Sequence, residues 1–162
     1  MNQVRVANCI SSPLWQRRDY PAFPFVRVQP TPPQSIVVVD DEKSYTELLT
    51  QILSQHLDCP VHAFARPVEA LKALPTLNPG VVVTDYFMPD LNGLEFIRQG
   101  AEVAPHASFV LISGHNLIAE KSQMARLPAL KGFLPKPFGW MKLIEEILRV
   151  WPPNTTPPTR RV

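Results

Sequence analysis

Polar side chains that could share one chemical task follow four separate apolar segments of the chain. Asp85 follows 81–84, the pair Asp40 and Asp41 follows 36–39, Ser113 follows 109–112, and Lys136 follows 132–135. If these segments are parallel strands, their carboxyl ends lie along one edge of a sheet, which is where α/β proteins place their ligands. Carboxylates, a hydroxyl and an ammonium on one edge would suit Mg²⁺ and a phosphoryl group.

Asp85 is the candidate nucleophile of such a site. A carboxylate can form a covalent aspartyl phosphate, and phosphoryl transfer uses a divalent cation that neutralises charge on the reacting oxygens. Asp40 and Asp41 could supply ligands for Mg²⁺, a cation that keeps several of its waters. Two simpler interpretations stay open. Asp85 could cap the turn that follows it, and one of the earlier pair could cap the helix expected to begin just after them.

Ser113, Lys136 and Phe133 have simpler interpretations too. Ser113, which precedes Gly114, could donate a hydrogen bond to a phosphoryl oxygen or be an ordinary turn serine. Lys136 could reach a phosphate as a point charge or lie in solvent, and the Lys136–Pro137 bond is a candidate cis peptide. Phe133 is either a strand aromatic or a ring that moves inward when Ser113 moves. Each signal is weak alone, but the order of these residues at separate strand ends gives them joint weight.

Two kinds of apolar segment alternate between residues 34 and 151. Short β-branched segments predict strands, and segments with apolar residues at helical spacing predict helices. The expected strands are 36–39, 61–64, 81–84, 109–112 and 132–134, and the expected helices are 42–57, 67–74, 94–104, 115–127 and 138–151. Near-continuous valine and isoleucine strands indicate a parallel sheet buried on both faces. The sequence therefore predicts an α/β fold, a doubly wound (βα)5 unit with a five-stranded sheet.

Prolines set the two ends of the chain apart from this middle region. Six prolines fall in 1–33 and four in 152–162. We therefore expect a mostly disordered, proline-rich extension before the folded unit 34–151, and a disordered tail after it. The extension also holds aromatic residues that would suit a short docking motif, namely Trp15, Tyr20, Phe23 and Phe25.

Charge and cysteine content exclude several classes of protein. The net charge is +2, but 1–33 carries +3 and the tail carries +2, so the middle region carries −3. A basic nucleic-acid surface is therefore not expected on the folded part. Cys9 and Cys59 lack metal-ligand spacing, and the absence of a disulfide scaffold favours a reducing cytoplasm. The apolar segments are strand-sized, so neither a membrane span nor a signal peptide is expected.

The motifs taken together resemble the receiver domain of two-component response regulators, including receivers attached to hybrid histidine kinases. The matching segments are 37–42, 84–93, 112–114 and 133–138. The resemblance runs from about 34 to 151, which is nearly three-quarters of the chain. It implies a flavodoxin-like receiver fold that acts as a signalling switch. Such a chain would catalyse its own phosphorylation and dephosphorylation, and would not be an enzyme acting on a metabolite.

The resemblance also implies roles for individual residues and a class of partner. Asp85 would be the phosphoacceptor, Lys136 would contact the phosphoryl group, and Ser113 and Phe133 would form the switch pair. The donor would be a histidine kinase or a histidine phosphotransfer protein, which makes the chain part of histidine-to-aspartate signalling. The resemblance leaves the downstream protein partner open, and neither direct DNA binding nor membrane contact is expected.

A magnesium site is implied on the same grounds. Asp40 or Asp41 would bind Mg²⁺ together with Asp85, and the backbone carbonyl of Phe87 would be a further ligand. Phe87 is bulky and apolar, which suggests the hypothesis that its ring shields an acyl phosphate from attacking water. His115 lies close to Ser113 in the sequence and could influence that water.

Two other functions remain in competition. A phosphate-independent interaction module would keep the receiver fold and use its surface constitutively, although the full set of site residues argues against this. A phosphohydrolase of similar topology would also use an aspartate nucleophile. Such enzymes usually resemble Asp-x-Asp at the nucleophile, and the sequence Asp85-Tyr86-Phe87 lacks the second aspartate.

Overall fold

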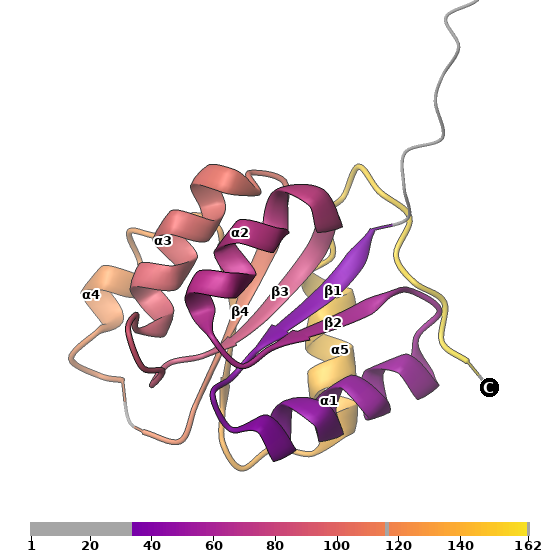
Figure 1. Ribbon diagram of the computed structural model, residues 1–162, viewed down its shortest axis with the longest axis horizontal. Coiled ribbons are helices and arrows are strands. Elements are labelled where there is room, and N and C mark those ends of the chain that lie inside the picture. The colour runs from indigo at the N-terminus through magenta and orange to yellow at the C-terminus, as the bar shows by residue number, and fades with distance from the viewer. Residues whose placement is uncertain (1–33, 116, 162) are drawn as a thin grey trace, which may run out of the picture. The chain divides into compact units, whose positions relative to one another are not determined.

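The computed structural model describes residues 34–115 and 117–161, which form one parallel five-stranded sheet with helices on both faces (Figure 1). The strands are β1 (Ser35–Val39), β2 (Val61–Phe64), β3 (Pro79–Asp85), β4 (Ser108–Ser113) and β5 (Leu130–Pro135), in the order β2-β1-β3-β4-β5. The helices are α1 (Lys43–His56), α2 (Pro67–Leu77), α3 (Gly93–Val103), α4 (Lys121–Met124) and α5 (Trp140–Val150). The predicted (βα)5 fold is confirmed. The extension expected for 1–33 lies outside the described residues.

Each face of the sheet has its own apolar core. In Figure 1, α1 and α5 lie on one side of the sheet and α2 and α3 on the other. Every residue of β1 and β3 is buried, as the continuous valine and isoleucine segments predict. Alternate residues of β1 serve opposite faces: Ile36 and Val38 pack in the core under α1 and α5, whereas Val37 and Val39 pack in the core under α2 and α3.

The register of the strands brings their carboxyl ends to the same level. Val39 pairs with Thr84, so the residues that follow β1 lie beside Asp85. Asp85 pairs with Ile112, the last residue before Ser113, and Ser113 pairs with Pro135. The polar residues at the ends of β1, β3, β4 and β5 therefore lie side by side along one edge of the sheet, as the sequence predicts.

The fourth helix differs from its prediction. The sequence predicts a helix over 115–127, whereas α4 is a single turn of four residues at Lys121–Met124. Leu117 is the one buried residue between 117 and 127, so the segment lacks the continuous apolar stripe that stabilises a longer surface helix. No helix in the described part of the chain is long and apolar enough to cross a membrane.

The structure contradicts the unstructured carboxyl-terminal tail that the prolines predict. Residues 152–161 (the C-terminal segment) run back to the end of α1, as the yellow trace in Figure 1 shows. Arg160 forms an antiparallel bridge with Leu57, and the Asp58 N–H donates to the Thr159 carbonyl at 3.0 Å. The Arg161 guanidinium donates to the Ser54 carbonyl at 3.0 Å. The last turn of a helix leaves carbonyls without intrahelical donors, and Arg161 satisfies one of them.

Candidate functional site

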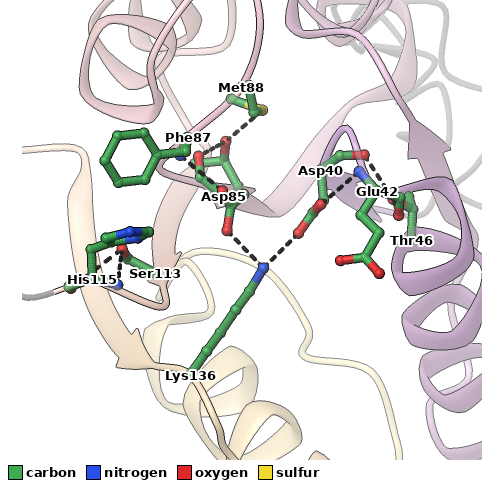
Figure 2. Close-up of polar contacts among 10 residues, drawn as sticks. Asp40, Glu42, Thr46, Asp85, Phe87, Met88, Ser113, His115 and Lys136 are labelled. Atoms are coloured by element: carbon green, nitrogen blue, oxygen red, sulfur yellow. Dashed lines mark hydrogen bonds and ion pairs between the residues drawn. The ribbon is translucent and has the colours of Figure 1, made fainter.

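Asp40 is held at the end of β1 by backbone and side-chain contacts. It is 2% exposed, and its Oδ1 accepts a hydrogen bond from the Glu42 N–H at 2.9 Å. The Thr46 hydroxyl donates to the Asp40 carbonyl at 2.8 Å, which ties the strand end to the first turn of α1 (Figure 2). The N-cap position of α1 is occupied by Glu42, whose side chain makes no capping hydrogen bond. N-capping of α1 by an aspartate therefore does not occur.

Asp85 lies at the end of β3, the central strand. Its Oδ2 accepts a hydrogen bond from the Phe87 N–H at 2.8 Å, so it does stabilise the turn that follows, as the simpler interpretation predicts. Its Oδ1 is free of this turn and forms an ion pair with the Lys136 ammonium at 2.7 Å. The α-carbon of Gly93 lies so close to the backbone of Asp85 that a Cβ at position 93 would collide with the Asp85 carbonyl oxygen. The position of Asp85 thus depends on the loop as well as on the strand.

Lys136 connects the two buried carboxylates. Its ammonium lies 2.9 Å from Oδ2 of Asp40 and 2.7 Å from Oδ1 of Asp85, as Figure 2 shows. The Lys136 N–H donates to the Ser113 carbonyl at 2.8 Å, and the Lys136–Pro137 bond is cis, as the sequence suggests. The structure therefore brings three of the predicted site residues into direct contact.

The electrostatics of this cluster follow from its burial. Burial raises the pKa of Asp85 above its ordinary value, although the hydrogen bond and the charge of Lys136 act in the opposite direction. Burial lowers the pKa of Lys136, but its hydrogen bonds with Asp85 and Asp40 outweigh that effect, so the pKa is raised. The ammonium therefore stays charged, and the ionised form of Asp85 is less favourable than it would be in water.

Ser113 lies beside this cluster and its hydroxyl is engaged with its own loop. The residue is buried at the end of β4, and its Oγ accepts a hydrogen bond from the His115 N–H at 3.1 Å. Phe133, the expected switch aromatic, lies on β5 opposite Leu111 and is 37% exposed. In this structure its ring is at the surface of the edge strand.

Phe87 and His115 form an aromatic rim near Asp85. The Phe87 side chain is 53% exposed, and its ring lies 4.5 Å from the His115 ring in an edge-to-face arrangement. The Tyr86 ring also contacts Phe87, with 4.6 Å between the ring centroids and the two planes nearly perpendicular. In Figure 2 the Phe87 and His115 side chains lie on the same side of Asp85. Such pairs prefer these geometries, which hold the exposed ring in place.

Comparison with known proteins identifies the family. The sequence profile of the response regulator receiver domain matches residues 36–148. The chain belongs to this family. Receiver domains are signalling modules of two-component systems, which is what the order of strand-end residues led us to expect.

Two curated relatives and one solved structure illustrate the similarity of this receiver to others. The response regulator MprA of Mycobacterium sp. (strain KMS) is 33% identical over 72% of this chain and 48% of its own length. The DNA-binding transcriptional regulator NtrC of Azospirillum brasilense is 28% identical over 76% of this chain and 25% of its own. The signal receiver domain of an HD domain-containing protein from Pseudomonas fluorescens Pf-5 has a TM-score of 0.67 and 19% identity, and the match covers 73% of this chain and 94% of that one. The receiver thus spans about half or less of these two curated relatives.

The oxygen atoms at this edge fit the Mg²⁺ that receiver domains generally bind. Asp40 and Asp85 approach one ammonium from two sides, so the pair can share one cation. Asp41 is exposed at the rim, outside this contact, and its carboxylate makes no hydrogen bond or ion pair with other described residues. The described residues contain no cluster of three or more His, Cys, Asp or Glu side chains arranged for a metal. Mg²⁺ does not require one, because it keeps waters and uses one or two carboxylates.

Two residues of α1 belong to the site although the sequence did not single them out. The Lys136 ammonium lies 4.4 Å from the centre of the Tyr45 ring, a cation–π contact, and the Thr46 hydroxyl bonds to Asp40. Tyr45 also falls at an apolar position of the helix expected over 42–57, and that simpler interpretation conceals its contact with Lys136. Their place in the first turn after a strand-end acidic pair is the signal that could have revealed them.

Proposed function

We propose that Asp85 of this receiver accepts a phosphoryl group from a phosphohistidine of a histidine kinase or histidine phosphotransfer protein. The contact that carries the proposal is the Lys136 ammonium, 2.7 Å from Asp85 and 2.9 Å from Asp40. One oxygen of Asp85 attacks phosphorus, the P–N bond to histidine breaks as the P–O bond forms, and the histidine leaves as imidazole after it is protonated. We propose this exchange and the later hydrolysis of the aspartyl phosphate, and no reaction on a metabolite. We also propose that the chain works in the cytoplasm.

The surrounding residues would prepare Asp85 for this transfer. Mg²⁺, held by Asp40, Asp41, Asp85 and the Phe87 carbonyl, would supply charge neutralisation for the reacting oxygens. Lys136 would exchange its ion pair with Asp85 for one with a phosphoryl oxygen. The Tyr45 ring would stabilise the ammonium during this exchange, because a cation over an aromatic face keeps a favourable contact while its anionic partner changes.

Ser113 would convert the modification into a change of surface. Its hydroxyl now accepts a hydrogen bond from the His115 N–H. A phosphoryl oxygen within reach would attract the Ser113 O–H as donor and draw the residue toward Asp85. Phe133 would then turn from the surface into the space that Ser113 leaves. The face formed by α4, β5 and α5 would change its shape and bind a different protein partner.

The first test is the intact mass of the protein after incubation with Mg²⁺ and acetyl phosphate. Wild type should gain one phosphoryl group, and Asp85→Ala should gain none. Phosphorylation of both proteins would assign the acceptor elsewhere. If wild type gains nothing and Mg²⁺ with beryllofluoride also leaves its melting temperature unchanged, a phosphate-independent interaction module becomes the better description.

A further inference from the structure

A groove lies between α1, α5 and the C-terminal segment, and its lining residues are separate from the Asp85 site. Its volume is about 240 Å³. It is lined by His56, Trp140, Met141, Ile144, Arg160 and Arg161. The C-terminal segment supplies two of these residues, so the groove exists because that segment docks on the end of α1.

The groove has an exposed aromatic and apolar floor. The His56 and Trp140 rings lie 4.4 Å apart, and Trp140 and Met141 remain 40% and 43% exposed. On α1, Leu48 and Ile52 precede His56 at intervals of four residues, so an apolar stripe leads along the helix to the groove. Tryptophan, methionine and arginine are enriched where proteins bind other proteins.

The rim of the groove is positively charged. The Arg161 guanidinium is fixed by the Ser54 carbonyl and by Asp58, 3.0 Å from each. The Arg160 side chain makes no ion pair with the residues that the structure describes, and none of the described lining residues is acidic. A carboxylate from outside the chain would therefore meet an available guanidinium beside an apolar surface.

The size of the groove favours one or two side chains of a peptide over a cofactor. Pockets that hold small molecules usually measure roughly 300–1,000 Å³, which is more than this groove offers. We propose that the groove binds an acidic peptide segment of a partner protein. An apolar side chain of the peptide enters beside Trp140 and Met141, and a neighbouring carboxylate pairs with Arg160. The proposal goes beyond the phosphoryl-transfer function, because none of the groove residues takes part in that chemistry.

A library of random peptides displayed on phage tests the proposal with the full chain as bait. Wild type should enrich peptides that combine aspartate or glutamate with a large apolar residue. A synthetic copy of an enriched peptide, fluorescently labelled, should bind wild type and bind Arg160→Glu and Met141→Glu at least about tenfold more weakly, a loss of about 1.4 kcal/mol. Arg126→Glu, which makes the same charge change at an exposed site outside the groove, should bind as wild type does.

The outcomes are decisive in both directions. Arg160 and Met141 are both exposed, so their substitution should leave the fold intact, and circular dichroism checks that each variant folds. Met141→Glu tests the apolar floor independently of the C-terminal segment. The proposal is overturned if no peptide is enriched, if enriched peptides lack carboxylates, or if Arg126→Glu weakens binding as much as Arg160→Glu. Acetyl phosphate is absent throughout, so these results do not depend on whether Asp85 can accept a phosphoryl group.

Discussion

Lys136 faces two buried carboxylates, and one ammonium cannot fully compensate both. Removing charged groups from water costs free energy that is recovered only when each is well paired. The raised pKa of Asp85 expresses the remaining cost, because burial disfavours its ionised form. A neutral side chain of the same shape at this position should therefore suit the folded protein better at neutral pH.

Asp85→Asn should stabilise the protein in a pH-dependent way. Since the pKa of Asp85 is higher in the folded than in the unfolded chain, the folded state binds more protons, and wild-type stability falls as pH rises from the ordinary carboxyl pKa through the folded value. The asparagine variant lacks this loss. Urea denaturation should show the variant to be more stable than wild type at pH 7, by about 1.4 kcal/mol per unit of pKa shift. The difference should be smaller at pH 4.

The matched control is Glu145→Gln, which neutralises an exposed carboxylate on α5. It should change stability little at either pH, because exposed charges interact weakly through water. If Asp85→Asn were no more stable than wild type at pH 7, the ionised carboxylate would not be costly in the fold.

Phe87→Asn should shorten the lifetime of the aspartyl phosphate proposed for Asp85. The ring, which the His115 and Tyr86 rings hold in place, should restrict the approach of water to Asp85. Loss of radiolabelled phosphate after donor removal should be faster in the variant, by roughly tenfold for about 1.4 kcal/mol of lost protection. Phe87→Leu keeps an apolar group there and should stay near the wild-type rate. Equal rates for all three proteins would disprove shielding.

The loop from β3 to α3 positions Asp85 through close backbone packing. The Gly93 N–H donates to the Tyr86 carbonyl at 2.8 Å, and the α-carbon of Gly93 faces the Asp85 carbonyl with no space for a side chain. The Asn92 side chain accepts a hydrogen bond from the Glu95 N–H at 3.0 Å and caps α3 directly after this contact. The start of α3 is therefore fixed against the end of β3.

Gly93→Ala should lower the stability of the fold and impair the phosphorylation proposed for Asp85. The new methyl group meets backbone, which cannot rotate away as a side chain can, so the cost should be about 1–3 kcal/mol in urea denaturation. Gly114→Ala is the matched control, because a Cβ at Gly114 has no atom within 4 Å. The control should match wild type in stability. Equal losses in the two variants would contradict the close packing at Gly93.

Local sequence patterns are sufficient to predict most of the fold and the centre of the site. β-branched segments specify strands, and each polar residue after a strand must lie at the edge of the sheet, so Asp40, Asp85 and Lys136 could be placed together. The contacts of Tyr45 could not, because a helical period shows which face is apolar and not which residue it meets across the fold. The single turn of α4 and the docked C-terminal segment depend on tertiary contacts that no local pattern records.

Contacts between residues far apart in the sequence hold the C-terminal segment against the end of α1. Arg161 bonds to Ser54 and to Asp58, which lie 107 and 103 residues earlier. The Arg161 N–H also donates to the His56 carbonyl at 2.8 Å. The C-terminal segment thus covers the junction between α1 and β2 and should protect it from local opening.

A chain that ends at Pro158 should lose this protection at one amide above all. The Asp58 N–H would lack its acceptor, the Thr159 carbonyl. Hydrogen exchange should become several-fold faster there, in line with the roughly 1 kcal/mol that a hydrogen bond contributes. The Asp40 N–H, which donates to the Phe64 carbonyl at 3.2 Å, should exchange as in the full chain. An unchanged Asp58 amide would show that the docked segment is dispensable.

The ion pair between Lys136 and Asp40 joins residues 96 positions apart, and this has a consequence for biosynthesis. A ribosome makes both aspartates long before it makes the lysine. While β5 is still inside the exit tunnel, pairing of β1 with β3 in their final register would place Asp40 and Asp85 close together without the ammonium that offsets their repulsion. The emergence of Lys136 relieves that repulsion, so the two strands should pair stably late in synthesis, once Asp85 and the lysine beside it are both available.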